Sequence, residues 1–135
     1  MGNRFKAWDK KMKRMVDPYL SEGFIMGINF KGEVIAYEED SNDPELFVYS
    51  DRFELLENSR MADIHEQDAF REDVIRVFER DRRYQIQKVV FKDGMFCGYS
   101  EKKACPYTSL DSIKRNHGFE ILGSALESPE LWEER

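Results

Sequence analysis

The chain has 135 residues, enough for one domain with a buried core, and 41% of them are hydrophobic while 36% are charged. The balance of 27 acidic against 21 basic residues gives a net charge of −6, which argues against a generic nucleic-acid-binding protein because such domains are usually basic overall. Aromatic residues, at 13%, favour β-strands and exclude disorder as a description of the whole chain.

The N-terminal third is predicted to form short strands. Residues 4–8 and 11–16 are strand candidates. In residues 24–30 the large apolar side chains alternate along the chain, which predicts a strand with one buried face. A turn at residues 31–32 and a return through residues 34–37 complete a predicted hairpin.

An acidic run at residues 38–45 precedes another strand candidate at residues 46–49. A calcium loop of the EF-hand type would need a regular ligand spacing and a central glycine, and this run has neither. We therefore interpret it as a solvated loop.

The segment from residue 70 to residue 83 carries two conflicting signals. Its apolar residues recur at helical spacing, and Glu–Arg pairs four residues apart support the same periodicity. Residues 74–78, however, form a β-branched run typical of a buried strand. Periodicity alone favours a helix, and both alternatives stay open at this stage.

A second hairpin is indicated more strongly than the first. Residues 89–91 and 95–97 are apolar runs that flank Asp93 and Gly94. The Asp-Gly dipeptide tolerates the left-handed backbone angles of a tight hairpin turn, so these runs are predicted to pair. A further short strand is predicted at residues 119–122.

Two short helices are predicted near the end of the chain. Ser109 can cap a helix over residues 110–115, where Asp111 in the first turn and basic residues in the last turn suit the helix dipole. Ser128 followed by Pro129 is typical of the start of a helix and predicts a final helical turn.

No residue pattern predicts a metal, cofactor or catalytic site. Cys97, Cys105 and His117 could converge on zinc, but their spacing fits no familiar finger and a fourth ligand is not evident. Cys97 lies in an apolar strand and is interpreted as a small buried residue. The chain also lacks a nucleophile elbow and a glycine-rich phosphate loop.

Basic residues cluster at residues 10–14 and again at residues 76–83. Nearby aromatic residues, including Tyr84, suggest a groove in which bases of a single strand stack. The competing interpretation is that charged residues at hairpin tips keep sheet edges soluble, with Glu79 and Asp81 weakening the positive potential. The candidate nucleic-acid-binding residues are Arg76, Arg80, Arg82 and Arg83.

The start of the chain lacks an apolar signal segment, and no stretch approaches the length of a membrane span. With only two cysteines in the sequence, a reducing cytoplasm without membrane contact is the expected location.

Two stretches of the chain resemble the YopX family of phage and prophage proteins. Residues 4–15 read Arg-Phe-Lys-Ala-Trp-Asp-Lys-Lys-Met-Lys-Arg-Met and are similar to the family's opening, a lysine or arginine followed by Phe-Arg-Ala-Trp-Asp, a Lys-rich turn and Met. Residues 119–131 read Phe-Glu-Ile-Leu-Gly-Ser-Ala-Leu-Glu-Ser-Pro-Glu-Leu and resemble its closing Glu-Val-Ile-Gly-Asn-Ile-Tyr-Glu-Asn-Pro-Glu-Leu. Residues 93–96 lie where the family has an Asn-Gly-Cys-Phe turn.

The middle of the chain departs from the family's pattern. The family usually carries a Thr-Gly…Asp…Asn-Gly…Ile-Tyr-Glu-Gly-Asp-Ile-Val block, of which residues 69–75 keep only the end, with Glu72 in place of the glycine. Residues 58–68 contain no glycine. The resemblance implies that residues 74–78 form a strand, although the loss of the glycine leaves room for a helix.

The resemblance implies one mainly β domain over residues 1–135. We expect an all-β or β-rich α+β fold, with short-stranded hairpins in a compact barrel-like or complex sheet and one or two short helices near the C-terminus. Trp8 and Trp132 are expected to hold this scaffold closed.

No activity, cofactor or catalytic residue follows from the family. We therefore expect a phage or prophage accessory protein in the cytoplasm of a host bacterium. It is expected to bind a host or phage protein, or further copies of itself, without catalytic activity. The alternatives are a nucleic-acid-binding module that uses the basic segment 76–83, and a small hydrolase or metalloenzyme.

Overall fold

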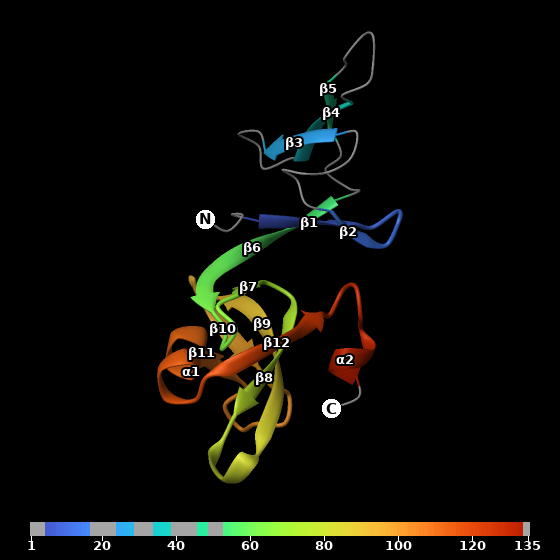
Figure 1. Ribbon diagram of the computed structural model, residues 1–135. Coiled ribbons are helices and arrows are strands. Elements are labelled where there is room, and N and C mark those ends of the chain that lie inside the picture. The colour runs from blue at the N-terminus through green and yellow to red at the C-terminus, as the bar shows by residue number, and fades with distance from the viewer. Residues whose placement is uncertain (1–4, 17–23, 29–33, 39–45, 49–52, 134–135) are drawn as a thin grey trace. The chain divides into compact units, whose positions relative to one another are not determined.

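The computed structural model describes residues 5–16, 24–28, 34–38, 46–48 and 53–133. It is rich in strands and has few, short helices, which confirms the predicted mainly β class (Figure 1). The chain divides into two compact units, residues 3–56 and residues 57–135.

The first unit begins with a hairpin of β1 (Phe5–Asp9) and β2 (Arg14–Val16), which pair antiparallel. The carboxylate of the buried Asp9 accepts hydrogen bonds from the backbone N–H groups of Lys11 and Met12, at 3.1 and 3.2 Å. This Asx turn uses the residues after Asp9 to reverse the chain. The strand predicted at residues 11–16 therefore starts only at Arg14.

A second sheet in this unit has the order β3-β4-β5, formed by Phe24–Ile28, Val34–Glu38 and Leu46–Val48. β3 and β4 pair antiparallel from Phe24 opposite Glu38 to Ile28 opposite Val34, which confirms the first predicted hairpin. Glu38, the first residue of the acidic loop predicted at residues 38–45, is instead the last residue of β4. The predicted turn at residues 31–32 and residues 39–45 lie outside the described residues.

The long strand β6 (Phe53–Ala62) contributes residues to both units. Phe53 and Ala7 are the buried residues of a small core in the first unit, with Val16 and Leu55 packed against them. Beyond Leu56, β6 pairs with the short strand β7 (Asp68–Phe70) inside the second unit.

The second unit is built on an antiparallel five-stranded sheet with the order β11-β10-β9-β8-β12. Each strand pairs antiparallel with its neighbours, and a bulge between Ile121 and Gly123 interrupts the pairing of β12 with β8. The strands are β8 (Asp73–Phe78), β9 (Tyr84–Lys92), β10 (Met95–Tyr99), β11 (Tyr107–Ser109) and β12 (Phe119–Ser124).

The segment with conflicting signals is a strand over residues 73–78, as the resemblance implied, so the helical periodicity is misleading. β8 lies between β9 and β12, and Val74, Ile75 and Val77 are buried. Burial on both faces removes the alternation that would mark a strand, because both sets of side chains must then be apolar. The chain beyond β8 turns through a short 3-10 helix, η1 (Arg80–Arg82), into β9.

The β9–β10 hairpin confirms the second prediction. Its two turn residues, Asp93 and Gly94, have φ angles of 51° and 83°, as a type I′ turn requires. Phe96 lies opposite Phe91, one pair beyond the Met95–Lys92 pair that flanks this turn.

Both predicted helices are present. In α1 (Leu110–Asn116) the Ser109 hydroxyl accepts a hydrogen bond from the Ser112 N–H, and the final helix is α2 (Glu130–Glu133). None of the helices in the described part of the chain is long and apolar enough to cross a membrane.

Helix α1 completes the main core, which lies on one face of the five-stranded sheet. Its buried residues are Ala69, Ile75, Val77, Val89, Leu110, Ile113 and Phe119. Packing against β10 is so close that a Cβ atom on Gly98 would lie 2.7 Å from Ile113 Cδ1. This rigid platform positions the hairpin tip that carries Phe91 and Phe96.

Candidate functional site

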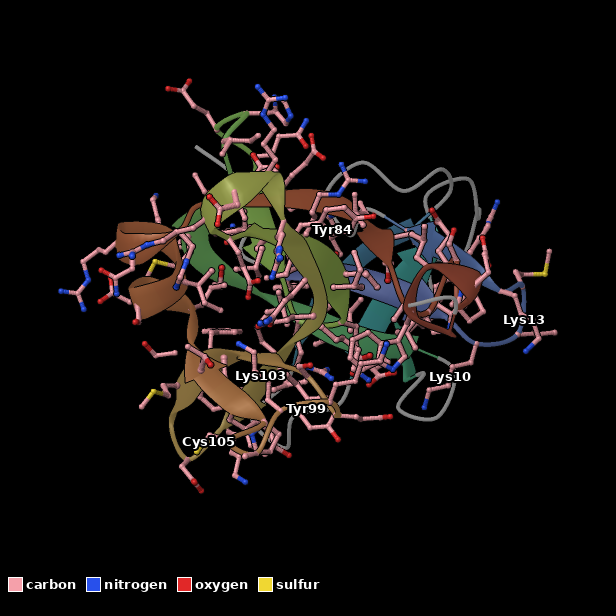
Figure 2. The ribbon with its side chains drawn as sticks, turned by 90° about the horizontal axis from the view of Figure 1, so that it is seen from below. Lys10, Lys13, Tyr84, Tyr99, Lys103 and Cys105 are labelled. Carbon is pink, nitrogen blue, oxygen red and sulfur yellow. The ribbon has the colours of Figure 1, made fainter. Side chains whose placement is uncertain are left out.

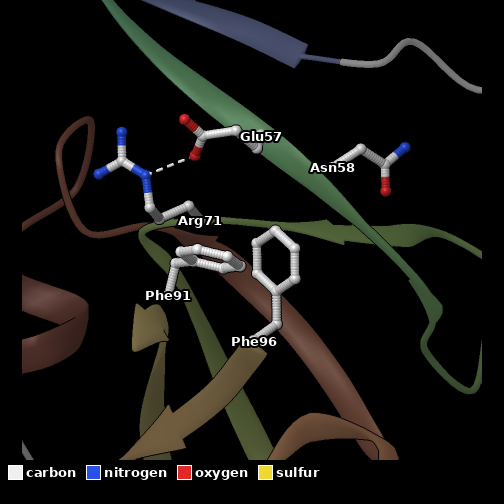
Figure 3. A pocket seen from close by; sticks show the side chains of 5 residues that line it. All are labelled: Glu57, Asn58, Arg71, Phe91 and Phe96. Atoms are coloured by element: carbon white, nitrogen blue, oxygen red, sulfur yellow. Dashed lines mark hydrogen bonds and ion pairs between the residues drawn. The ribbon is translucent and has the colours of Figure 1, made fainter. Parts of the chain in front are cut away.

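An open pocket of about 520 Å³ lies in the second unit, beside the tip of the β9–β10 hairpin (Figure 3). We call it the Phe91 pocket. It is lined by Glu57, Asn58, Arg71, Phe91 and Phe96.

The apolar wall of the pocket consists of two phenyl rings. The ring centroids of Phe91 and Phe96 are 5.0 Å apart and the ring planes meet at 64°, an edge-to-face arrangement. Phe91 is 54% exposed, which is high for a side chain of this size. Phe91 and Phe96 lie opposite each other on adjacent strands, and the type I′ turn connects these strands.

The polar wall of the pocket is an ion pair across neighbouring segments. Arg71 Nε donates to Glu57 Oε2 at 2.6 Å, and the Arg71 backbone N–H donates to the Glu57 carbonyl at 2.9 Å. A second carboxylate, that of Glu72, lies 3.8 Å from the Arg71 guanidinium and 3.4 Å from the Lys88 ammonium. The charged side chains of this wall therefore largely neutralise one another.

The amide of Asn58 is oriented by two hydrogen bonds. Its Nδ2 donates to Asp68 Oδ2 at 2.9 Å, and its Oδ1 accepts from the backbone N–H of Arg60 at 2.7 Å. Because both ends of the amide are occupied, Asn58 shapes the pocket rather than offering a reactive group.

This arrangement can hold an apolar or aromatic side chain. Two preorganised rings offer contact area, and the ion pair provides a polar rim. The sequence predicts the hairpin but not the pocket, because Glu57 and Arg71 are fourteen residues apart and only the fold brings them together. The one local signal was the pair of phenylalanines flanking the Asp-Gly turn.

The four arginines predicted to bind nucleic acid lie on or next to the β8–β9 hairpin. Arg76 lies within β8, where its guanidinium pairs with Glu120 at 3.3 Å and covers the Tyr84 ring at 4.8 Å from the centroid. Arg80 and Arg82 lie in η1 and Arg83 follows it; all three are exposed.

A small polar cluster joins the segment after β6 to β12. The buried Asp63 carboxylate accepts hydrogen bonds from the backbone N–H groups of His65, Gln67 and Ile121. Burial acts to raise the pKa of Asp63, but the hydrogen bonds from Ile121, Gln67 and His65 outweigh it, so the pKa lies below its usual value.

His65 extends this cluster to the surface. Its Nε2 lies 2.9 Å from Glu120 Oε2, and this hydrogen bond raises the pKa of the imidazole above its usual value, an effect that the Asp63 carboxylate reinforces. No serine, threonine or cysteine is hydrogen-bonded to His65 among the described residues. The cluster therefore has the form of a structural contact.

The residues considered for zinc are not brought together as a cluster. Cys97 is buried in β10, and this burial raises the pKa of its thiol. Cys105, labelled in Figure 2, is exposed on the connection between β10 and β11, and His117 is the C-cap residue that follows α1. Within the described ranges, no three His, Cys, Asp or Glu side chains are arranged to hold a metal ion.

The expectation that Trp8 and Trp132 hold one scaffold closed stays a prediction, because the two residues belong to different units. Trp8 is buried in β1. Trp132 is half-buried, with its ring 6.0 Å from that of Tyr99 and 5.5 Å from Lys88 Nζ. Leu131 contacts Gly123 closely, since a Cβ atom there would lie 2.7 Å from Leu131 Cδ1.

Comparison with protein families decides the relationship that the two terminal motifs suggested. The model of the YopX protein family matches residues 4–133. The chain belongs to the YopX family. The match spans the strands of both units and includes every residue of the Phe91 pocket.

Solved structures agree with this assignment at the level of the fold. The crystal structure of the protein YopX from Bacillus subtilis has a TM-score of 0.69 and 19% identity, and the match covers 97% of this chain and 98% of that chain. The crystal structure of protein EF1440 from Enterococcus faecalis has a TM-score of 0.56 and 16% identity, with 95% and 96% covered. At these identities the likeness extends to the fold alone.

A search of the curated proteins finds no significant match to this chain. The site geometry therefore carries the functional argument.

Proposed function

We propose that this YopX-family protein is an accessory protein of a phage or prophage that acts by binding another protein through the Phe91 pocket. The observation that carries the proposal is the half-exposed Phe91 ring, held edge-to-face against Phe96 beside a pocket of about 520 Å³. Aromatic residues and arginine are the residue types most enriched in the energetic centres of protein interfaces.

Rigidity of the pocket supports this proposal. Phe91 and Phe96 lie on paired strands joined by a two-residue turn, and Phe96 also packs against the main core. A preformed aromatic surface loses little conformational entropy when a partner binds, so more of the contact energy contributes to affinity.

The polar groups of the pocket favour binding over catalysis. The Glu57 carboxylate is paired with Arg71, and the Asn58 amide is held at both ends. General acid–base chemistry needs a titratable group placed beside a reacting atom, and neither side chain is arranged for that. A small hydrolase or metalloenzyme remains the alternative that this geometry supports least.

Site-specific photocrosslinking tests the proposal. Benzoylphenylalanine is placed at Phe91, and separately at the exposed Lys114 on α1 as a matched control, in the bacterium that carries the gene. We expect the Phe91 position alone to give a discrete protein adduct, which unlabelled wild-type protein suppresses and the Phe91→Asp variant does not.

The identity of the adduct separates the possible partners. An adduct with a second copy of this chain would indicate a homo-oligomer, and an adduct with a different polypeptide would indicate a host or phage partner. Equal labelling from both positions, or no adduct at Phe91 although the variant protein accumulates in the cell, would contradict the proposal.

A further inference from the structure

The β8–β9 hairpin ends in a turn with concentrated positive charge. The segment from Arg76 to Tyr84 contains four arginines against two carboxylates, those of Glu79 and Asp81, in a chain whose net charge is −6. In Figure 1 this hairpin extends from the five-stranded sheet as a projecting tip.

Three arginines at this tip lack the ion pairs that three other arginines of the second unit form. Arg71, Arg76 and Arg115 each form an ion pair with a carboxylate. Arg80, Arg82 and Arg83 are exposed, and their side chains form no ion pair or hydrogen bond with any described residue. Three guanidinium groups in one tight turn repel one another, and a bound anion would remove that repulsion.

Backbone geometry at the tip is also costly. Asp81 and Arg82 both have φ angles of 62°, in the left-handed region that glycine and asparagine enter more readily. The turn is closed by the Arg83 N–H, which donates to the Arg80 carbonyl at 3.3 Å, and by the Glu79 N–H, which donates to the Arg83 carbonyl at 2.9 Å. Strained backbone conformations cluster at functional sites, where they hold side chains in a particular orientation.

An exposed aromatic ring adjoins the three arginines. Tyr84, labelled in Figure 2, is the first residue of β9. It is 55% exposed. The Arg76 guanidinium covers the ring at 4.8 Å from its centroid and is itself held by Glu120. Arg76 therefore occupies one face of the ring, while more than half of the surface of Tyr84 stays exposed to solvent.

We propose that the tip of the β8–β9 hairpin binds single-stranded nucleic acid, with phosphates on Arg80, Arg82 and Arg83 and a base stacked on Tyr84. Guanidinium groups bind phosphate oxygens through paired hydrogen bonds, and aromatic rings accept any base. This combination favours a single strand, because the bases of a duplex are already stacked on one another. The site is separate from the Phe91 pocket and does not depend on the proposed protein partner.

Fluorescence anisotropy of the full chain with labelled oligo-dT and oligo-U of about 12 nucleotides tests the proposal at low and moderate salt. We expect the Arg80→Gln/Arg82→Gln/Arg83→Gln variant to bind at least about tenfold more weakly than wild type. Its slope of log affinity against log salt should fall by about 2, as expected when three phosphate contacts to a single strand are lost. Comparison of oligo-dT with oligo-U shows whether the ligand is DNA or RNA.

A matched control removes equal charge elsewhere in the second unit. The Lys102→Gln/Lys103→Gln/Lys114→Gln variant should keep wild-type affinity to within about twofold if the site is local. Equal loss in the two triple variants would show diffuse electrostatic attraction and overturn the proposal.

The aromatic part of the site is tested separately. Tyr84→Ala should weaken single-strand binding by about fivefold or more, whereas Tyr84→Phe, which keeps the ring, should bind as wild type does. Unchanged affinity of Tyr84→Ala, equal binding of a duplex or of polyglutamate, or no salt-dependent binding by the wild type would each overturn the proposal. Unfolding curves of every variant check that the substitutions leave the fold intact.

Discussion

Glu72 holds a backbone conformation that glycine adopts more readily. Its φ angle is 74°, and its backbone is fixed on both sides, because its N–H donates to the Val89 carbonyl and its carbonyl accepts from the Ala125 N–H, each at 2.8 Å. The YopX pattern has glycine at this place. The chain therefore keeps the left-handed turn but lacks the residue that adopts this conformation with little conformational free energy. The side chain recovers part of the cost through Lys88, at 3.4 Å.

Replacing Glu72 by glycine and by alanine separates strain from charge. Both variants lose the ion pairs, but only Glu72→Gly relieves the left-handed backbone, so we expect it to be more stable than Glu72→Ala by about 1 kcal/mol. Urea unfolding measures the difference. An alanine variant as stable as the glycine variant would mean that the turn carries no strain.

At the scale of elements, the segment after β6 closes the outer edge of β12. Ile64 N–H donates to the Phe119 carbonyl at 3.0 Å, and the Asp63 carboxylate accepts from the Ile121 N–H at 3.0 Å. Unpaired strand edges invite association with other chains, and this segment occupies backbone groups that would otherwise be available. His65 then joins the same segment to Glu120.

The contact between His65 and Glu120 should depend on pH. Because the pKa of His65 is raised in the folded chain above its usual 6.5, its stabilising effect is complete below that value and is lost as the pH rises through the folded pKa. The stability difference between wild type and His65→Ala should therefore be larger at about pH 5 than at about pH 8.5. Chemical unfolding at both pH values measures it.

The Glu120→Gln variant is the control, because it removes the charge that raises the pKa of His65 and should flatten the pH dependence. Asp63 does not interfere over this range, since its lowered pKa keeps its contribution present above the usual value of 3.8, and that contribution is lost only as the pH falls through the folded pKa. A His65→Ala effect that is equal at the two pH values would contradict the assignment.

For the whole molecule, the question is whether the two units unfold together. The prediction of a single domain over residues 1–135 stays a prediction. The physical reason for this prediction is that β6 continues from Phe53 to Ala62 and contributes residues to both units. Breaking such a strand at the boundary would expose backbone hydrogen-bonding groups.

The two tryptophans report on the units separately, because Trp8 lies in the first unit and Trp132 in the second. In Trp132→Phe the fluorescence follows the first unit, and in Trp8→Phe it follows the second. We expect each curve to coincide with unfolding followed by circular dichroism of the same variant, as a single cooperative domain requires. A fluorescence midpoint that differs from the circular dichroism midpoint in either variant would show two domains.

The elements that could be predicted from the sequence are those whose causes lie within a few residues. Asp93 and Gly94 dictate the type I′ turn by themselves, and Ser109 caps α1 through the N–H of Ser112, three positions away. The Asx turn of Asp9 is equally local, yet it shortened β2 relative to the prediction because the hydrophobic pattern alone does not show where a turn ends.

Amino-acid sequence by itself determined the mainly β class, the two hairpins, both C-terminal helices and the family, because short-range chemistry and chain motifs carry that information. Tertiary structure decided that residues 73–78 form a strand, since their burial between β9 and β12 outweighs the helical spacing of their side chains. It alone assembled the Phe91 pocket, because the contact of Glu57 with Arg71 depends on distant segments that only the folded sheet places side by side.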